Sequence, residues 1–288
     1  MSERSILAEA GTAWIGLYYA QQRLALARDS LDSLRDFVPV AVSAVASGSA
    51  RPAESLAIRR ELLEIEDAIT RIEAARAAAR ARLQRYIAGS EPVAAGGAPQ
   101  VTVDPEELRF ALEANPELRL ADAEQRRAEA AADLARAEKR PDFGVSVTYG
   151  HRNPDFGSAV SVMGSVTLPI FTDRRQNPRI AAAEADAAAA SAERVDRLRV
   201  IRARFEADLA AWRSALQQWE RARDQLLPLA RDRAELETAS FAAGRADLVD
   251  VIAAKSALAL LELEILEREQ MAVEAAATLR LTYGEDRP

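Results

Sequence analysis

Apolar residues recur at a seven-residue spacing along two segments of the chain, and this spacing constrains the fold more than any other feature. Between residues 5 and 45, Leu17, Leu24 and Leu31 lie seven apart. Between residues 53 and 88 the steps alternate between four and three through Ile58, Leu62, Ile65, Ile69 and Ile72. A stripe sustained over several heptads is typical of coiled coils. The sequence therefore predicts two long helices that pack along their lengths.

The alanine-rich composition also favours long helices. Hydrophobic residues make up 49% of the 288 residues, but many of them are alanine. Alanine is the strongest helix former and buries little surface, so a compact globule would gain little hydrophobic free energy. The net charge is −7, with acids and bases interspersed. This distribution is typical of solvated helix faces and argues against a nucleic-acid partner.

The chain lacks the residues that most catalytic and metal sites require. Cysteine is absent and His151 is the single histidine, which argues against disulfides, zinc–thiolate sites and multi-histidine metal sites. We find no phosphate-binding loop, nucleophile elbow or His-Glu-x-x-His motif. We therefore expect no enzymatic activity, no cofactor and no metal, and we expect His151 to be a solvated loop residue.

The sequence shows no helical membrane span and no visible targeting segment. No run of 18 apolar residues is present, so no membrane-spanning helix is predicted. The segment Met1–Arg4 is not followed by the apolar region of a signal peptide, so we expect none in this chain.

Proline and glycine divide the first half of the chain. Pro39 is expected to kink the first helix, and residues 46–53 are expected to form a turn between the two helices. Residues 93–114 contain further Gly and Pro and are predicted to be a linker. Asn115 is a natural N-cap, so a third helix is predicted over 116–140.

Residues 143–171 change from a helical period to a period of two. In the first half apolar residues alternate with Gly, Ser and Thr at Phe143, Val145, Val147 and Tyr149. Apolar positions alternate in the same way from Val160 to Leu168. Two strands of about 9–11 residues fit a β-hairpin with one apolar face, at the length of tilted barrel strands.

The last third of the chain returns to helical periodicity. The sequence predicts a helical hairpin over 178–284, with a bend at Pro228 and a turn over 242–249. The expected seam of its first helix contains Leu209, Trp212, Leu216, Trp219 and Leu226.

A shift of 196 residues superimposes the first helical hairpin on the last. Gly48 then coincides with Gly244, and Leu62 coincides with Leu258. This internal repeat divides the chain into a partial first repeat over 1–92, a linker over 93–114 and a second repeat over 115–288. The second repeat has a helix and a β-hairpin before its coiled coil, so we expect that the first repeat lacks these front elements.

The order of these motifs resembles the TolC-like outer-membrane efflux proteins. The matching motifs are Asn-Pro-Glu-Leu at 115–118, Arg-Pro-Asp-Phe at 140–143, Val-Thr-Leu-Pro-Ile-Phe at 166–171, and the two turns after Gly48 and Gly244. The resemblance covers nearly the whole chain. It implies a mainly α fold with long antiparallel coiled-coil hairpins and one β-hairpin that contributes to a trimeric outer-membrane barrel.

The resemblance also implies partners and a location. Family members are homotrimers whose barrel lies in outer-membrane lipid and whose helical tunnel lies in the periplasm. The tunnel docks on a periplasmic adaptor (membrane fusion) protein and an inner-membrane transporter, so substrate is exported passively. One hairpin per chain gives six strands in a trimer, whereas the family contributes two hairpins per subunit.

The turns are identified by this resemblance as periplasmic tips. Asp250 matches an acidic position that lines the closed tip, and Glu54 is its counterpart in the first repeat. Arg245 and Asp247 either hold the tip shut or contact the adaptor. As an alternative, Asp250, Asp247 and Glu54 are acids that complement the positive ends of their helices.

Aromatic residues of the β-hairpin have two interpretations. Phe143, Tyr149 and Phe171 form either a girdle at the membrane interface or ordinary aromatic contacts in a sheet. We favour the girdle because of the family resemblance.

Three functional hypotheses follow. The first is a subunit of an outer-membrane export channel. The second is a soluble helical coiled-coil scaffold, or a non-functional truncated relative, whose hairpin packs on protein. A periplasmic adaptor is a weaker third hypothesis, because adaptors carry one helical hairpin and this chain has two.

Overall fold

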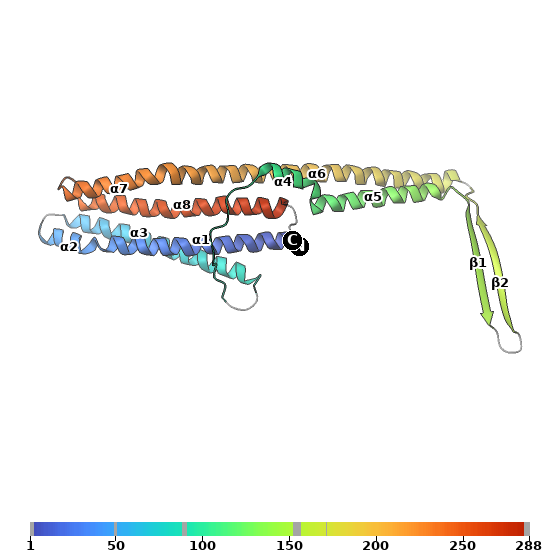
Figure 1. Ribbon diagram of the computed structural model, residues 1–288, viewed down its shortest axis with the longest axis horizontal. Coiled ribbons are helices and arrows are strands. Elements are labelled where there is room, and N and C mark those ends of the chain that lie inside the picture. The colour runs from blue at the N-terminus through green and yellow to red at the C-terminus, as the bar shows by residue number, and fades with distance from the viewer. Residues whose placement is uncertain (1–2, 49–50, 88–90, 152–156, 171, 285–288) are drawn as a thin grey trace. The chain divides into compact units, whose positions relative to one another are not determined.

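The computed structural model describes residues 3–48, 51–87, 91–151, 157–170 and 172–284. These residues form helices with one β-hairpin (Figure 1), which confirms the predicted fold class. The helices are α1 (Glu3–Arg35), α2 (Val38–Ala46), α3 (Pro52–Gln84), α4 (Pro105–Ala111), α5 (Pro116–Ala137), α6 (Gln176–Arg221), α7 (Leu227–Ala242) and α8 (Leu248–Tyr283), and the strands are β1 (Asp142–His151) and β2 (Ser158–Thr167). None of the helices within these ranges is long and apolar enough to cross a membrane.

The chain divides into two compact units. One unit contains Met1–Ala111 and Arg204–Pro288, and the other contains Leu112–Ala203. The division differs from the expected repeat boundaries because it follows contacts between helices rather than sequence similarity. We call them the coiled-coil unit and the hairpin unit.

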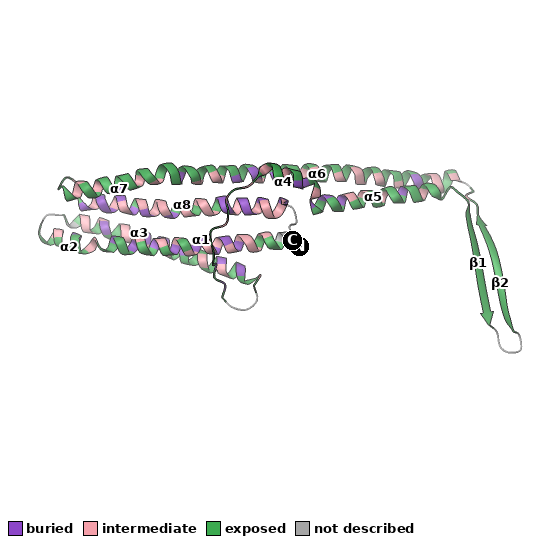
Figure 2. Cartoon of the chain, in the orientation of Figure 1, coloured by how far each residue is buried: buried purple, intermediate pink, exposed green. Residues whose placement is uncertain are grey.

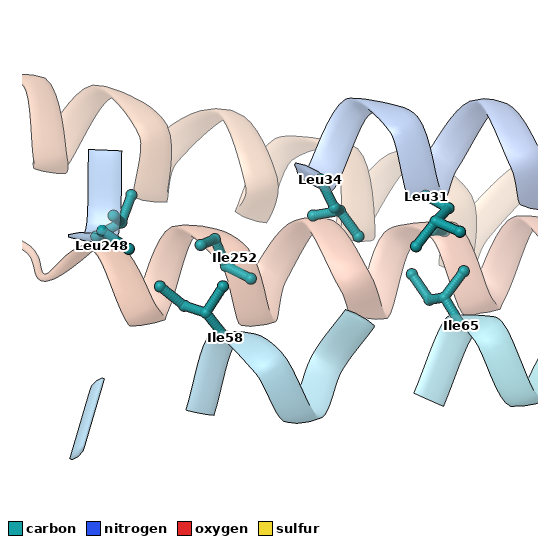
Figure 3. Close-up of a cluster of buried hydrophobic side chains, with 8 residues drawn as sticks. Leu31, Leu34, Ile58, Ile65, Leu248 and Ile252 are labelled. Carbon is teal, nitrogen blue, oxygen red and sulfur yellow. The ribbon is translucent and has the colours of Figure 1, made fainter. Parts of the chain in front are cut away.

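Apolar heptad positions form the core of the coiled-coil unit. Figure 1 shows α3 beside α1 and α7 beside α8, and α8 also packs against α1 and α3. Leu17, Leu24 and Leu31 are buried, as is Ile65, which confirms the predicted seams. Near the turns, side chains of α1, α2, α3 and α8 meet in one cluster (Figure 3): Leu31, Leu34, Ala41, Ile58, Ile65, Leu248, Ile252 and Ala259.

The helix interruptions lie close to the predicted prolines. The first helix ends at Arg35, and α2 begins with Val38 so that Pro39 occupies its first turn. This position tolerates proline because the missing N–H would have no intrahelical partner. At Pro228 a π-helical turn over Ala222–Leu226 precedes α7, which again places the proline in a first turn. The wider turn accommodates a residue that cannot donate to the preceding turn.

Two expectations about the helices were wrong. Leu226 was assigned to the buried seam but is 40% exposed, because the π-helical turn changes the helical register there. Residues 93–114 are not only a linker, since they include α4 and a 3₁₀ turn over Leu112–Ala114. Leu108 and Ala111 of α4 are buried, so tertiary contacts stabilise a helix too short to form alone.

The hairpin unit begins with the predicted cap. The Asn115 side chain accepts a hydrogen bond from the Glu117 backbone N–H at 2.9 Å, and α5 follows. Glu184 of α6 pairs with Arg136 of α5 at 2.8 Å. The two strands are antiparallel and pair Phe143 with Val166.

A half-buried carboxylate lies in the coiled-coil unit beside a buried tyrosine. Burial raises the pKa of Glu269, and the Tyr19 hydroxyl and the Arg223 guanidinium oppose this effect. Burial, followed by the charge of Glu269, also raises the pKa of Tyr19, which is only 1% exposed. The Arg223 guanidinium lies 4.4 Å from the ring centre of Trp219.

The raised pKa of Glu269 predicts the pH dependence of stability. The folded state holds this proton to a higher pH than the unfolded state does, so Glu269 lowers stability as the pH rises above the unfolded value of about 4.3. We expect Glu269→Gln to raise the melting temperature at pH 7 and to flatten its decline between pH 4 and 7. Glu235→Gln, which changes an exposed acid of α7, is the control. An identical decline in wild type and Glu269→Gln would contradict this assignment.

Candidate functional site

One face of the β-hairpin consists of large apolar side chains. On this face Phe143 pairs with Val166, Val145 with Gly164, Val147 with Val162 and Tyr149 with Val160, and the polar pair of His151 with Ser158 ends it. The apolar side chains are 56–78% exposed, and Figure 2 shows both strands as exposed throughout. Within the described residues, no other element covers this face. It is therefore an apolar surface that requires an environment other than water.

The opposite face of the hairpin is small and largely polar. It pairs Gly144 with Ser165 and Thr148 with Ser161, and Met163 is its one large apolar residue. A Cβ atom at Gly144 would lie 2.6 Å from the Ser165 Oγ, so glycine suits this close approach. Ten residues per strand and this alternation, which Met163 and Gly164 interrupt, match a barrel strand with one lipid-facing side.

The structure describes two of the three residues of the predicted aromatic girdle, Phe143 and Tyr149. Phe143 is 74% exposed and Tyr149 is 66% exposed, and they lie near opposite ends of β1 on the same face. The Tyr149 hydroxyl donates to the Ser158 Oγ at 2.9 Å, and Nδ1 of His151 lies 2.9 Å from the same oxygen. Phe171 lies outside the described residues. The girdle therefore stays a prediction, with Phe143 and Tyr149 exposed on the apolar face.

The turn between α7 and α8 forms the second tip. Gly244 has φ +68°, its N–H donates to the Phe241 carbonyl at 2.9 Å, and the Arg245 N–H donates to the Ser240 carbonyl at 2.8 Å. This is a Schellman motif, which favours glycine because side chains disfavour a left-handed backbone. The Asp250 carboxylate accepts from the Asp247 backbone N–H at 3.4 Å, as in a capping box.

The first tip also has a glycine with a left-handed backbone, but its side-chain contact differs. Gly48 has φ +76° and its N–H donates to the Val45 carbonyl at 3.1 Å. At the positions that correspond to Asp247 and Asp250, Arg51 Nε donates to Glu54 Oε1 at 3.0 Å. Glu54 thus forms an ion pair, whereas Asp250 caps its helix.

The structure places the two tips near each other. Glu54 is the main cause of a raised pKa for Arg51, and the charge of Asp247 on the other tip contributes as well. Arg245, Asp247 and Asp250 are exposed. Sequence analysis missed Arg51, although an arginine three residues before Glu54 was a visible signal for an ion pair.

The described residues contain no cluster of His, Asp and Glu that could hold a metal ion. Glu54 and Asp250 lie in the first turns of α3 and α8, where acids complement the positive ends of these helices. Their role at the tip stays a prediction.

A sequence model described as "outer membrane efflux protein" matches residues 108–285. This match covers more than half of the chain, and the chain belongs to the outer membrane efflux protein family. The predicted TolC-like resemblance is therefore confirmed. No curated protein sequence matches the chain.

Solved structures of similar fold agree with this assignment. A membrane protein from Pseudomonas aeruginosa matches with a TM-score of 0.80 and 19% identity, over 98% of this chain and 68% of that protein. VceC from Vibrio cholerae matches with a TM-score of 0.76 and 16% identity, over 98% and 70%. The open state of the MtrE channel from Neisseria gonorrhoeae matches with a TM-score of 0.74 and 18% identity, over 98% and 66%. This chain thus spans about two thirds of their length.

The left-handed backbone at the second tip makes Gly244 sensitive to substitution. We expect Gly244→Ala to lower the free energy of unfolding by about 1–2 kcal/mol, because a side chain is unfavourable at this φ. Urea unfolding followed by circular dichroism measures the effect. Gly97→Ala is the matched control, since φ is not left-handed there and no atom lies within 4 Å of the added Cβ. Equal stability of Gly244→Ala and wild type would contradict the role of the turn.

Proposed function

We propose that the chain acts as a subunit of a homotrimeric outer-membrane channel that exports substrates passively. The observation that carries the proposal is the β-hairpin with one exposed apolar face and one small polar face. Its two strands pair only with each other within the described residues. Backbone groups at open strand edges cannot remain unpaired in lipid, so the hairpin needs neighbouring strands from other chains.

The remaining parts of the proposal concern the helices and their partners. The coiled-coil hairpins would form a periplasmic tunnel that docks on a periplasmic adaptor protein and an inner-membrane transporter, which supplies the energy. Gly48, Gly244 and Arg245 would shape the tips that meet the adaptor. Membership of the efflux family and the two exposed tips support this assignment.

The same proposal assigns an electrostatic role to the tip acids. Copies of Asp250, together with Asp247 and Glu54, would place negative charge at the closed end of the tunnel. A ring of carboxylates attracts cations and repels anions. No covalent chemistry is involved, in keeping with a channel rather than an enzyme.

A soluble scaffold remains the competing function, and the hairpin distinguishes the two. Val147 is 67% exposed and pairs with Val162 near the middle of the apolar face. A cationic residue at the lipid-facing midplane costs about 2–4 kcal/mol. We expect Val147→Arg to abolish bilayer conductance and to weaken the trimer in detergent, measured by planar-bilayer recording and light scattering.

Thr148→Arg is the matched control, because Thr148 lies next in sequence on the polar face. It should retain insertion and trimer formation. If Val147→Arg inserts and conducts as well as Thr148→Arg, the apolar face does not contact lipid. If the wild-type chain neither inserts nor conducts, the scaffold is favoured.

The variant Asp250→Asn tests whether the carboxylates at the tip select for cations. Asparagine keeps an oxygen that can cap α8 but removes the charge, so folding should be unaffected. We expect the ratio of cation to anion permeability to fall about two- to tenfold if the carboxylates line the conduction path. Reversal potentials under a salt gradient report this ratio. Asp232→Asn, an exposed acid of α7 away from the tip, should leave it unchanged. If Asp232→Asn lowers the permeability ratio and Asp250→Asn does not, the assignment is wrong.

A further inference from the structure

A cavity of about 560 Å³ lies at the base of the β-hairpin, inside the hairpin unit. The end of α5, the beginning of β1, the segment after β2 and the beginning of α6 all contribute to its wall. Among the described residues, neither the tip residues nor Phe143 and Tyr149 line it. The cavity therefore has no role in the proposed function as described so far.

Three arginines line this cavity. Arg179 forms an ion pair with Glu138 at 3.6 Å. Among the described residues, this is the only ion pair that any of the three arginines forms. Arg140 and Arg175 are exposed, and their guanidinium groups donate no hydrogen bond to any other described residue, so they can donate to a ligand. Arginine presents a planar fork of donors that binds phosphate in a bidentate manner. The cavity can thus hold a phosphodiester.

Hydrogen-bond acceptors line the same cavity. The Gln176 Oε1 atom is buried and accepts no hydrogen bond from any residue that the structure describes. The carboxylates of Asp142 and Glu138 lie in the wall as well. A buried acceptor without a donor is unfavourable, so a ligand that brings an N–H donor would be stabilised here. The two carboxylates also disfavour a small free anion.

The third part of the wall is apolar. Leu168 and Ile170 continue the alternation of the β2 apolar face past the end of the strand, and both line the cavity together with Leu134. These three side chains are 62–66% exposed. A ligand with an apolar tail could therefore run from the cavity onto the hairpin face.

We propose that this cavity binds the headgroup of a phosphatidylethanolamine molecule, with Arg140 and Arg175 on the phosphate. The ammonium group would donate to Gln176 Oε1 and Asp142, and an acyl chain would lie along Leu168 and Ile170. Phosphatidylcholine has the same phosphate and acyl chains, but its trimethylated amine has no N–H donor. The inference rests on the proposed function, because it requires a hairpin whose apolar face lies in lipid.

The test titrates the purified full-length chain in dodecyl maltoside with dioleoyl-phosphatidylethanolamine or dioleoyl-phosphatidylcholine and counts bound lipids by native mass spectrometry. We expect the ethanolamine lipid to bind about tenfold more tightly, because the choline lipid leaves the buried Gln176 Oε1 acceptor unpaired. The double variant Arg140→Gln/Arg175→Gln should weaken its binding about tenfold or more. Arg126→Gln/Arg127→Gln on α5, with the same loss of charge, should bind as wild type does.

A second variant separates the headgroup contact from folding. Gln176→Leu should remove most of the preference for ethanolamine over choline and leave the circular dichroism spectrum unchanged. The proposal is wrong if Gln176→Leu keeps the wild-type preference for the ethanolamine lipid over the choline lipid. It is also wrong if Arg140→Gln/Arg175→Gln binds the ethanolamine lipid as tightly as wild type does. Competition by soluble O-phosphoethanolamine at the lipid's own concentration would also overturn it, since the site would then not recognise a lipid.

The same titration distinguishes failure of this inference from failure of the proposed function. Equal binding of both lipids by a chain that forms trimers and conducts would refute the headgroup site alone. Absence of any lipid binding together with absence of conductance would refute the channel, and the headgroup site with it.

Discussion

The close packing of apolar stripes between α1, α3 and α8 is the interaction on which the coiled-coil unit depends. The stripes carry leucine and isoleucine at the buried positions and alanine where helices approach closely. Alanine lets the helix axes come together, and the larger residues fill the space between them. Because α8 packs against both α1 and α3, helices of the first and last helical hairpins share one unit.

In the β-hairpin, unlike the coiled-coil unit, the large apolar side chains are not buried within the chain. Its large apolar side chains are exposed and its own two strands cannot bury them, so its stability depends on surroundings that the single chain does not supply. Lipid and additional strands are the environment that fits such a face. The arginines and acceptors at the base of the hairpin lie where an apolar surface changes to a polar one, and phospholipid headgroups have the same mixed chemistry.

The sequence predicted those features that depend on local periodicity and turn chemistry. The heptads identified the buried seams, alternation identified both strands, and Asn115, Gly48 and Gly244 marked caps and turns. Leu226 was misassigned because a π-helical turn changes the register without a sequence signal other than Pro228. Helix α4 was missed because its seven residues form a helix through tertiary contact. The proximity of Arg51 and Asp247 joins residues far apart in sequence, which a single sequence cannot show.

The two tips share a glycine turn but differ in what holds the following helix: an ion pair at Arg51 and Glu54, and a carboxylate cap at Asp250. The two tips thus share a left-handed glycine and differ in side-chain chemistry. In the proposed trimer the six tips would alternate around the ring, so the pore end would have true threefold symmetry and only approximate sixfold symmetry. A docking protein would then encounter two non-equivalent grooves, and six identical adaptor molecules could occupy them only by binding in two different ways.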